Sequence, residues 1–196
     1  MKVASVFSGI GGLDLGFKNA GFGVEFANEW ERGVANTYKS NLPDVPIKQI
    51  NFRDLEWDNV KVDGLIGAPP ILPFDSETPD GDISITKAYA ECLKQNNFSF
   101  ICLGYGNRAV FAQDFNRLYS ELEKLYNLMI FGYKDQSIIY GVKDKRFKIV
   151  KPLIDELRTP EIVLKSTEGL EEMRGEVIYP EFSYRVARAI YEAFKI

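Results

Sequence analysis

The sequence contains no histidine, and this absence excludes several kinds of active site at once. A Ser/His/Asp triad, a Cys/His dyad, histidine acid–base catalysis and a histidine-ligated zinc site all need that side chain, so no metal site is predicted. Cysteine is scarce as well: Cys92 and Cys102 are the two in the chain, and they form no CxxC pair. The sequence therefore favours a reducing, cytoplasmic environment.

Positive charge and long apolar runs are also in short supply. The 24 Lys and Arg are outnumbered by 28 Asp and Glu, which gives a formal net charge of −4. Phosphate neutralisation supplies much of the affinity of nucleic-acid binders, so we expect weak or no DNA binding by this chain alone. No run approaches the ~18 apolar residues of a membrane span. Asp14 also interrupts the apolar amino terminus, so we expect neither a membrane anchor nor a signal peptide.

Hydrophobic residues make up 45% of the 196 residues, enough for the core of one α/β domain. Runs typical of strands alternate with helical periodicity along the chain. This alternation predicts βαβ units, and hence an α/β fold with a mostly parallel sheet and helices on both faces. The expected strands are 2–7, 23–28, 47–50, 64–67, 98–103, 128–131 and 147–150, and the expected helices are 13–19, 31–41, 83–95, 113–126 and 181–194.

A glycine-rich turn follows the first predicted strand in the run FSGIGGLDLGF. In a parallel α/β sheet the first turn lies at the carboxyl edge, where ligands bind. Gly9, Gly11 and Gly12 would let the backbone approach a ligand without interference from Cβ atoms. The turn alone fits a nucleoside-cofactor site and a tight turn of positive φ equally well.

The second predicted strand ends at Asn28-Glu29-Trp30. A carboxylate there can accept two hydrogen bonds from a ribose diol, and an indole can stack on adenine. Taken separately, Glu29 also fits a helix start favoured by the macrodipole, and Trp30 a core aromatic. Their position beside the glycine turn favours a nucleoside cofactor.

Six stretches carry a family resemblance: FSGIGGLDLGF, NEWERGVANTYKSN, DGLIGAPPILPF, FSFICLGYGNRAVF, YGVKDKRFKIV and YRVARAIYEAF. In this order they resemble the first, second, fourth, sixth, eighth and tenth motifs of the cytosine-5 DNA methyltransferases, which transfer a methyl group from S-adenosylmethionine to carbon 5 of cytosine. The resemblance spans about residues 3–194. It implies the Rossmann-like fold of S-adenosylmethionine-dependent methyltransferases, with a terminal reversed strand.

The resemblance implies S-adenosylmethionine or S-adenosylhomocysteine as the cofactor, with Glu29 on the ribose hydroxyls and Trp30 on the adenine. Asn51 stands where the family usually has an aspartate for the adenine amino group, and the Gly-Asn pair that opens the tenth motif is absent near Tyr179-Pro180. We therefore expect weakened cofactor binding. The implied cofactor residues are Phe7, Gly9, Gly11, Leu13, Glu29, Trp30, Asn51 and Pro69.

The sequence departs from the family at both groups that carry its chemistry. The family uses a Pro-Pro-Cys thiolate as nucleophile, and here the loop reads Pro69-Pro70-Ile71. The acid of a Glu-Asn-Val motif is replaced by Gly104, at a position that we expect to need positive φ. Cys102, inside an apolar run, is interpreted as an inert core residue. No catalytic residue is predicted, and Ile71 is expected to pack into an emptied pocket.

The remaining expectations concern domains and partners. Arg146 and Lys148 are the candidates for the substrate side, within the eighth motif. Residues 1–150 are predicted to form the methyltransferase-like core and 179–196 a helix that packs back on it. Residues 151–178 would be a short linker in place of the family's target-recognition domain, too small for a base-reading surface. DNA would then be reached through a partner subunit.

Three functions remain open on the sequence. The first is a degenerate homologue without catalytic activity that serves as an S-adenosylmethionine-binding regulatory or partner module. The second is an active cytosine-5 methyltransferase or one subunit of a split enzyme. The third is a folded remnant without a selected function.

Overall fold

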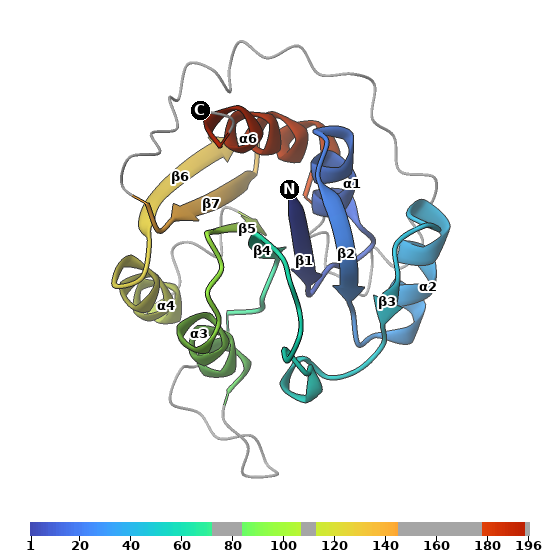
Figure 1. Ribbon diagram of the computed structural model, residues 1–196, viewed down its shortest axis with the longest axis horizontal. Coiled ribbons are helices and arrows are strands. Elements are labelled where there is room, and N and C mark those ends of the chain that lie inside the picture. The colour runs from blue at the N-terminus through green and yellow to red at the C-terminus, as the bar shows by residue number, and fades with distance from the viewer. Residues whose placement is uncertain (72–83, 107–112, 145–177, 195–196) are drawn as a thin grey trace.

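The computed structural model describes residues 1–71, 84–106, 113–144 and 178–194. These residues build one sheet of strand order β3-β2-β1-β4-β5-β7-β6 (Figure 1). β1, β2, β3, β4 and β5 pair in parallel, whereas β7 is antiparallel to both of its neighbours. The strands are β1 (Lys2–Val6), β2 (Gly23–Asn28), β3 (Ile47–Lys48), β4 (Gly64–Gly67), β5 (Phe100–Gly106), β6 (Asn127–Tyr133) and β7 (Gln136–Val142).

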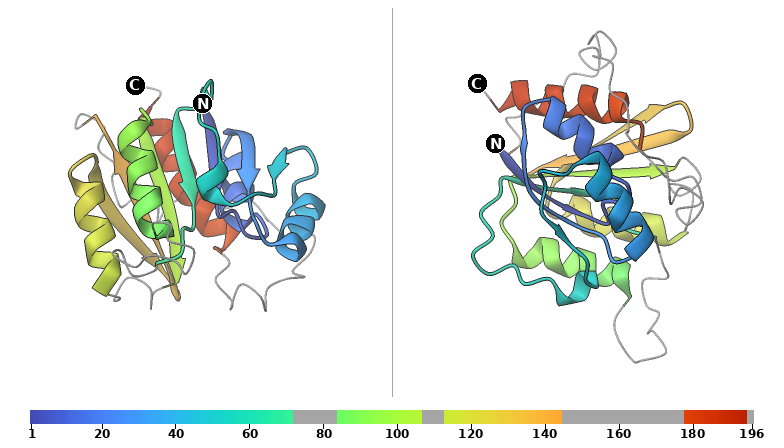
Figure 2. Two further views of the ribbon diagram at one scale, coloured as in Figure 1. Left: turned by 90° about the horizontal axis from the view of Figure 1, so that it is seen from below. Right: turned by 90° about the vertical axis from the view of Figure 1, so that its right-hand side faces the viewer.

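Helices cover both faces of the sheet, which confirms the predicted α/β architecture. One face carries α1 (Gly12–Asn19) and α6 (Pro180–Ala193), and the other carries α3 (Ile85–Gln95) and α4 (Gln113–Glu123), as Figure 2 shows. A short 3-10 helix, η1 (Phe52–Asp54), joins the α3 side. Helix α2 (Arg32–Asn41) lies near β3 and packs through Tyr38 and Leu42 on Ala27 of β2.

The central strand β5 shows why the core divides into two layers. Successive side chains of a strand point to opposite faces, so Phe100 and Cys102 pack under α1 and α6, while Ile101 and Leu103 pack under α3 and α4. Every one of these side chains is fully buried. A parallel strand that is buried on both faces has a continuous run of apolar residues, as in the sequence FICL of residues 100–103.

The carboxyl-terminal part of the sheet differs most from the expectation. A reversed strand was expected, and β7 is antiparallel to both of its neighbours, but its residues were not predicted as a strand and it lies between β5 and β6. It begins after a tight turn in which Lys134 has a φ of 53°, a conformation more typical of Gly or Asn than of Lys. Strand β5 is correspondingly longer than expected, because β7 pairs with it as far as Gly106. The expected strand 147–150 lies outside the described residues.

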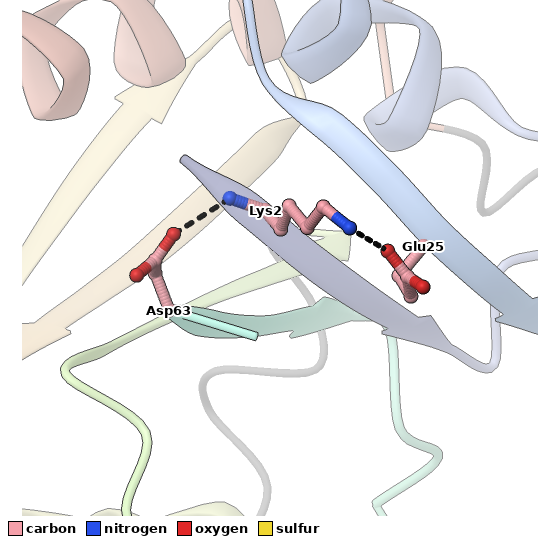
Figure 3. Close-up of polar contacts among 3 residues, drawn as sticks. All are labelled: Lys2, Glu25 and Asp63. Atoms are coloured by element: carbon pink, nitrogen blue, oxygen red, sulfur yellow. Dashed lines mark hydrogen bonds and ion pairs between the residues drawn. The ribbon is translucent and has the colours of Figure 1, made fainter. Parts of the chain in front are cut away.

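The amino ends of three neighbouring strands are tied together by Lys2 (Figure 3). Its backbone N–H donates to Asp63 Oδ2 at 2.7 Å, just before β4, and its Nζ pairs with Glu25 Oε2 of β2 at 2.7 Å. Both contacts are exposed, and an exposed ion pair contributes about 0–1 kcal/mol. They lie at the edge of the sheet opposite the glycine turn, away from the candidate site.

Helices α1 and α6 cross at Gly16, which has no side chain. A Cβ atom on Gly16 would lie 2.5 Å from the backbone nitrogen of Tyr184 and would overlap the Cβ of Ser183. The Ser183 hydroxyl donates to the Leu13 carbonyl at 2.5 Å across the same crossing. The glycine therefore permits the backbone approach that holds α6 on the sheet.

Replacing Gly16 with alanine should lower the free energy of unfolding by at least about 1–3 kcal/mol, because the rigid backbone of α6 must move away. Urea denaturation would measure the change. Gly33→Ala is the matched control: a Cβ there meets nothing closer than Glu31 Oε1 at 3.9 Å, and alanine should raise stability by about 0.5–1 kcal/mol. Equal effects of the two substitutions would contradict the close crossing.

Candidate functional site

The glycine turn between β1 and α1 lies at the carboxyl edge of the parallel strands, as predicted from the sequence. Three of its residues adopt left-handed conformations: Phe7 has a φ of 50°, Gly9 of 56° and Gly11 of 93°. Phe7 is the unusual one, because left-handed backbone is uncommon for a bulky side chain. Such local strain is typical of ligand-binding positions.

Glu29 follows directly after β2 and faces this turn. Its Oε2 accepts a hydrogen bond from the Gly9 backbone N–H at 3.1 Å, and its Oε1 accepts one from the Glu31 backbone N–H at 3.0 Å. Partial burial raises the pKa of the carboxyl above its ordinary value, and the backbone donors of Glu31 and Gly9 oppose that rise. A carboxylate has about four acceptor positions, so two backbone donors leave room for further donors.

The side chain of Trp30 is 70% exposed, and Ile50 is 39% exposed. Among the described residues they are two of three large hydrophobic side chains with such exposure, the third being Ile130 on β6. Trp30 follows β2 and Ile50 follows β3, the strand beside it, so both lie at the same edge. The core interpretation of Trp30 is wrong, and Glu29 is bordered by apolar surface of the kind that a planar ligand covers.

Asn51 begins η1 instead of projecting freely at the edge. Its Oδ1 accepts a hydrogen bond from the Arg53 backbone N–H at 3.0 Å and so caps the short helix. The adjacent Phe52 is buried, and its ring lies 4.9 Å from that of Phe7. The Asn51 side-chain oxygen can therefore accept one more hydrogen bond. Phe52 packs against Phe7 at the start of the turn.

Pro69 and Ile71 follow β4. Pro69 is buried, and Ile71 is half-buried against the core cluster beneath α3 and α4. That cluster also contains Val6 and Leu65, from the two strands next to the loop. An apolar side chain thus packs at the position where the family resemblance implies a cysteine thiol.

Gly104 lies inside β5, not at its end, and pairs with Ile138 of β7. The expectation of positive φ is wrong, because Gly104 is not among the residues of left-handed backbone. What requires glycine is Ile178: a Cβ on Gly104 would overlap Ile178 Cγ1 and lie 2.7 Å from Cδ1. The segment before α6 is held there by the Tyr179 backbone N–H, which donates to Gln136 Oε1 at 2.7 Å.

The positions of Ile71 and Gly104 lie on opposite faces of the sheet. Ile178, which covers Gly104, belongs to the cluster beneath α1 and α6, whereas Ile71 packs on the cluster beneath α3 and α4. Alternation along β5 gives the same answer, because Gly104 follows Phe100 and Cys102 on the α6 side. A side chain at position 104 would therefore meet a different core cluster from the one that Ile71 contacts.

The two cysteines are buried and free of disulfides. Burial raises the pKa of the Cys92 thiol to about 12 and raises that of Cys102 further. The reactive form of cysteine is the thiolate, so both are unreactive at neutral pH. Arg146 and Lys148, the substrate-side candidates, lie outside the described residues, as does nearly all of the predicted linker 151–178.

Asp14 was not singled out by the sequence analysis as a functional residue, yet it is a fully buried carboxyl. Ser5 Oγ donates to its Oδ2 at 2.9 Å, and the Tyr38 hydroxyl donates to its Oδ1 at 2.8 Å. Desolvation nonetheless raises the pKa of Asp14 from 3.8 to about 6. The folded state thus holds this proton more tightly than the unfolded state does.

Asp14 should make the folded state less stable as the pH rises. Its contribution of about 3 kcal/mol to the free energy of unfolding is fully present below pH 3.8 and is lost as the pH passes about 6. Denaturant titrations across this window should show a larger loss of stability in the wild type than in Asp14→Asn. Asp44→Asn, at an exposed carboxylate, is the control. Parallel pH curves for wild type and Asp14→Asn would contradict the buried-carboxyl account.

Neither a metal-binding cluster nor a membrane-spanning helix is present among the described residues. No group of three or more Cys, Asp or Glu side chains there could hold a metal ion. In the same part of the chain, no helix is long and apolar enough to cross a membrane.

Comparisons with known proteins agree with this geometry. Residues 1–84 match the family described as C-5 cytosine-specific DNA methylase. The type II methyltransferase M.NgoPII of Neisseria gonorrhoeae is 42% identical over 72 residues, which cover 36% of this chain and 21% of that protein. The type II methyltransferase M1.HphI of Haemophilus parahaemolyticus is 26% identical over 202 residues, which cover 96% of this chain and 50% of that protein. At most, then, the chain spans about half the length of these relatives.

Solved structures show the same fold. A prophage-encoded protein from E. coli, assigned as a DNA modification methyltransferase, aligns with a TM-score of 0.64 at 22% identity, covering 79% of this chain and 50% of that one. The fold is thus the Rossmann-like fold of the S-adenosylmethionine-dependent methyltransferases. Within that class, the first 84 residues of the chain are similar to the cytosine-5 DNA methyltransferase family.

Proposed function

We propose that this chain is a catalytically inactive member of the cytosine-5 DNA methyltransferase family that retains a binding site for S-adenosylmethionine or S-adenosylhomocysteine. The observation that carries the proposal is Glu29, whose carboxylate joins the glycine turn to the end of β2 beside an exposed indole. A binding module can act on a partner without performing chemistry itself.

The residues at the sheet edge fit the nucleoside half of this cofactor. Glu29 has acceptor positions left for the two ribose hydroxyls, and Trp30 presents an exposed planar surface for the adenine. Gly9 has the left-handed backbone that side chains resist, so the turn can lie close to a ligand there, whereas the missing side chain of Gly11 makes room for Tyr38 and Leu42. Asn51 can accept one hydrogen bond from the adenine amino group.

The other half of the cofactor has weaker support. Helix α6 begins with Pro180, which has no backbone N–H, and the Tyr179 N–H is already donated to Gln136. The Gly-Asn pair of the family's tenth motif is absent here as well. We therefore expect the adenosine moiety to supply most of the affinity, and total binding to be weak.

Ile71 and Gly104 stand where the resemblance implies the nucleophile and the acid, so the chain lacks both groups. S-adenosylmethionine supplies an electrophilic methyl group when bound, but the chain must activate carbon 5 of cytosine with a nucleophile and an acid. Neither side chain can do so, and Ile178 covers the place where the acid would stand. Cys102 offers no replacement, because it is buried with a raised pKa.

The proposal is tested by two assays on the unmodified chain. Titration calorimetry should detect S-adenosylhomocysteine binding, and incorporation of tritiated methyl groups into mixed DNA should stay at background. The incorporation assay is repeated with candidate partner subunits. Binding without incorporation supports the proposal, incorporation by the chain alone contradicts inactivity, and no binding contradicts the retained site.

A further inference from the structure

The glycine turn is held on its outer side by helix α2. The side-chain amide of Asn41 donates through Nδ2 to the backbone carbonyl of Ile10 at 2.8 Å, and this contact is buried. Ile10 lies between Gly9 and Gly11, both of left-handed backbone. Glycine can adopt many backbone conformations, and here two glycines flank Ile10. A hydrogen bond to the Ile10 carbonyl therefore restricts the backbone conformations of both glycines.

A second contact holds the same turn from α2. The ring of Tyr38 and the side chain of Leu42 lie against Gly11: a Cβ there would overlap Leu42 Cδ1 and lie 3.2 Å from two ring carbons of Tyr38. The Tyr38 hydroxyl continues inward to Asp14 Oδ1 at 2.8 Å. The helix thus contacts the turn by packing and is itself anchored to α1.

On its inner side the turn is held by the end of β2. Glu29 accepts from the Gly9 N–H, and the Ser8 backbone N–H donates to the Asn28 carbonyl at 3.0 Å. Glu29 is also the side chain assigned to the ligand. The shape of the turn therefore decides where Glu29 and the backbone of Gly9 lie relative to each other.

We infer that Asn41 and Tyr38 are positioning residues that hold the glycine turn in its ligand-binding shape. Neither is assigned to touch the ligand. A buried amide is costly unless its hydrogen bonds are made, and a helix that needed only packing could carry leucine at position 41. The inference rests on the proposed cofactor site for its ligand, whereas the ordering of the turn can be measured without any ligand.

The test compares Asn41→Leu with Thr37→Val. Thr37 is also buried in α2, and its hydroxyl donates to the Gly33 carbonyl within the same helix. In the ligand-free protein, hydrogen exchange of the Gly9 and Gly11 amides should speed up about tenfold in Asn41→Leu and stay unchanged in Thr37→Val. The dissociation constant of S-adenosylhomocysteine, measured by calorimetry, should rise about tenfold in the first variant only.

Tyr38→Phe provides a second variant in case Asn41→Leu does not fold. It keeps the ring against Gly11 and removes the hydroxyl contact with Asp14, so we expect faster exchange at Gly11. Unchanged exchange at Gly9 and Gly11 in the folded variants, or the same acceleration in Thr37→Val, would overturn the positioning role. If the wild type binds no S-adenosylhomocysteine, the proposed function fails, and the exchange rates still decide this inference.

Discussion

Replacing Glu29 with alanine is expected to abolish measurable binding of S-adenosylhomocysteine. The wild-type carboxylate can accept from both ribose hydroxyls, and each hydrogen bond to a charged group contributes about 1.5–3 kcal/mol. Losing two of them lowers the affinity by about 100-fold or more, since 1.4 kcal/mol corresponds to a factor of ten. The alanine also removes the acceptor of the Gly9 N–H and loosens the turn. Titration calorimetry on the purified variant measures the loss.

Two further variants separate the carboxylate's role from general damage. Glu29→Gln keeps one carbonyl oxygen and most of the shape, and it should still weaken binding at least about tenfold, through loss of one charged acceptor. Glu31→Gln changes an exposed carboxylate two positions along, and its dissociation constant should stay near the wild-type value. Unchanged binding in Glu29→Ala would show that the ligand site has been wrongly assigned.

The second large effect concerns attempts to restore catalysis, which should fail. Neither Ile71→Cys nor Ile71→Cys with Gly104→Glu should incorporate tritiated methyl groups into DNA above background. The thiol would return on the α3 and α4 side and the carboxyl on the α6 side, against Ile178. Groups that must act together lose nearly all activity when one is misplaced, so a single restored group recovers almost nothing. An active cytosine-5 methyltransferase assayed on the same DNA is the positive control.

The cause of that failure can be separated from simple unfolding. Gly104→Glu should destabilise the chain by overlap with Ile178, and shortening the neighbour in Gly104→Glu, Ile178→Ala should recover part of the stability. The recovered variant with Ile71→Cys should fold and still lack activity. Incorporation by that variant would contradict the assignment of positions 71 and 104 to opposite faces. Incorporation by the unmodified chain would make Cys102 the first residue to replace.

The amino-terminal half of the fold was predictable because its signals are local. Strands β2 and β4 have the predicted bounds, and the glycine turn falls between β1 and α1 as expected. Each of these strands has buried residues on both faces and is followed by a helix or a proline pair. The bounds of each strand can therefore be predicted from a short stretch of sequence. The placing of Glu29 beside Gly9 followed from the parallel order of β1 and β2 alone.

Features that depend on distant contacts were not predictable. Strand β7 contains the run SIIYGV, in which apolar and polar residues do not alternate, and such a run fits a buried strand. Its position between β5 and β6, however, depends on pairing with both of these strands. The requirement for glycine at position 104 comes from Ile178, far along the chain, and not from a local backbone conformation. Asn41 and Asp14 likewise make their hydrogen bonds with the turn and with Tyr38 only when α2 packs against α1 and the turn.

Crystals of the chain grown with S-adenosylhomocysteine test the central claim most directly. The account predicts ordered ligand at the carboxyl edge of β1 and β2, with its ribose hydroxyls donating to the Glu29 carboxylate and its adenine against Trp30. Asn51 should lie near the adenine amino group. Ligand bound elsewhere, or a glycine turn closed by the chain's own side chains with no ligand density against Glu29, would contradict a retained cofactor site.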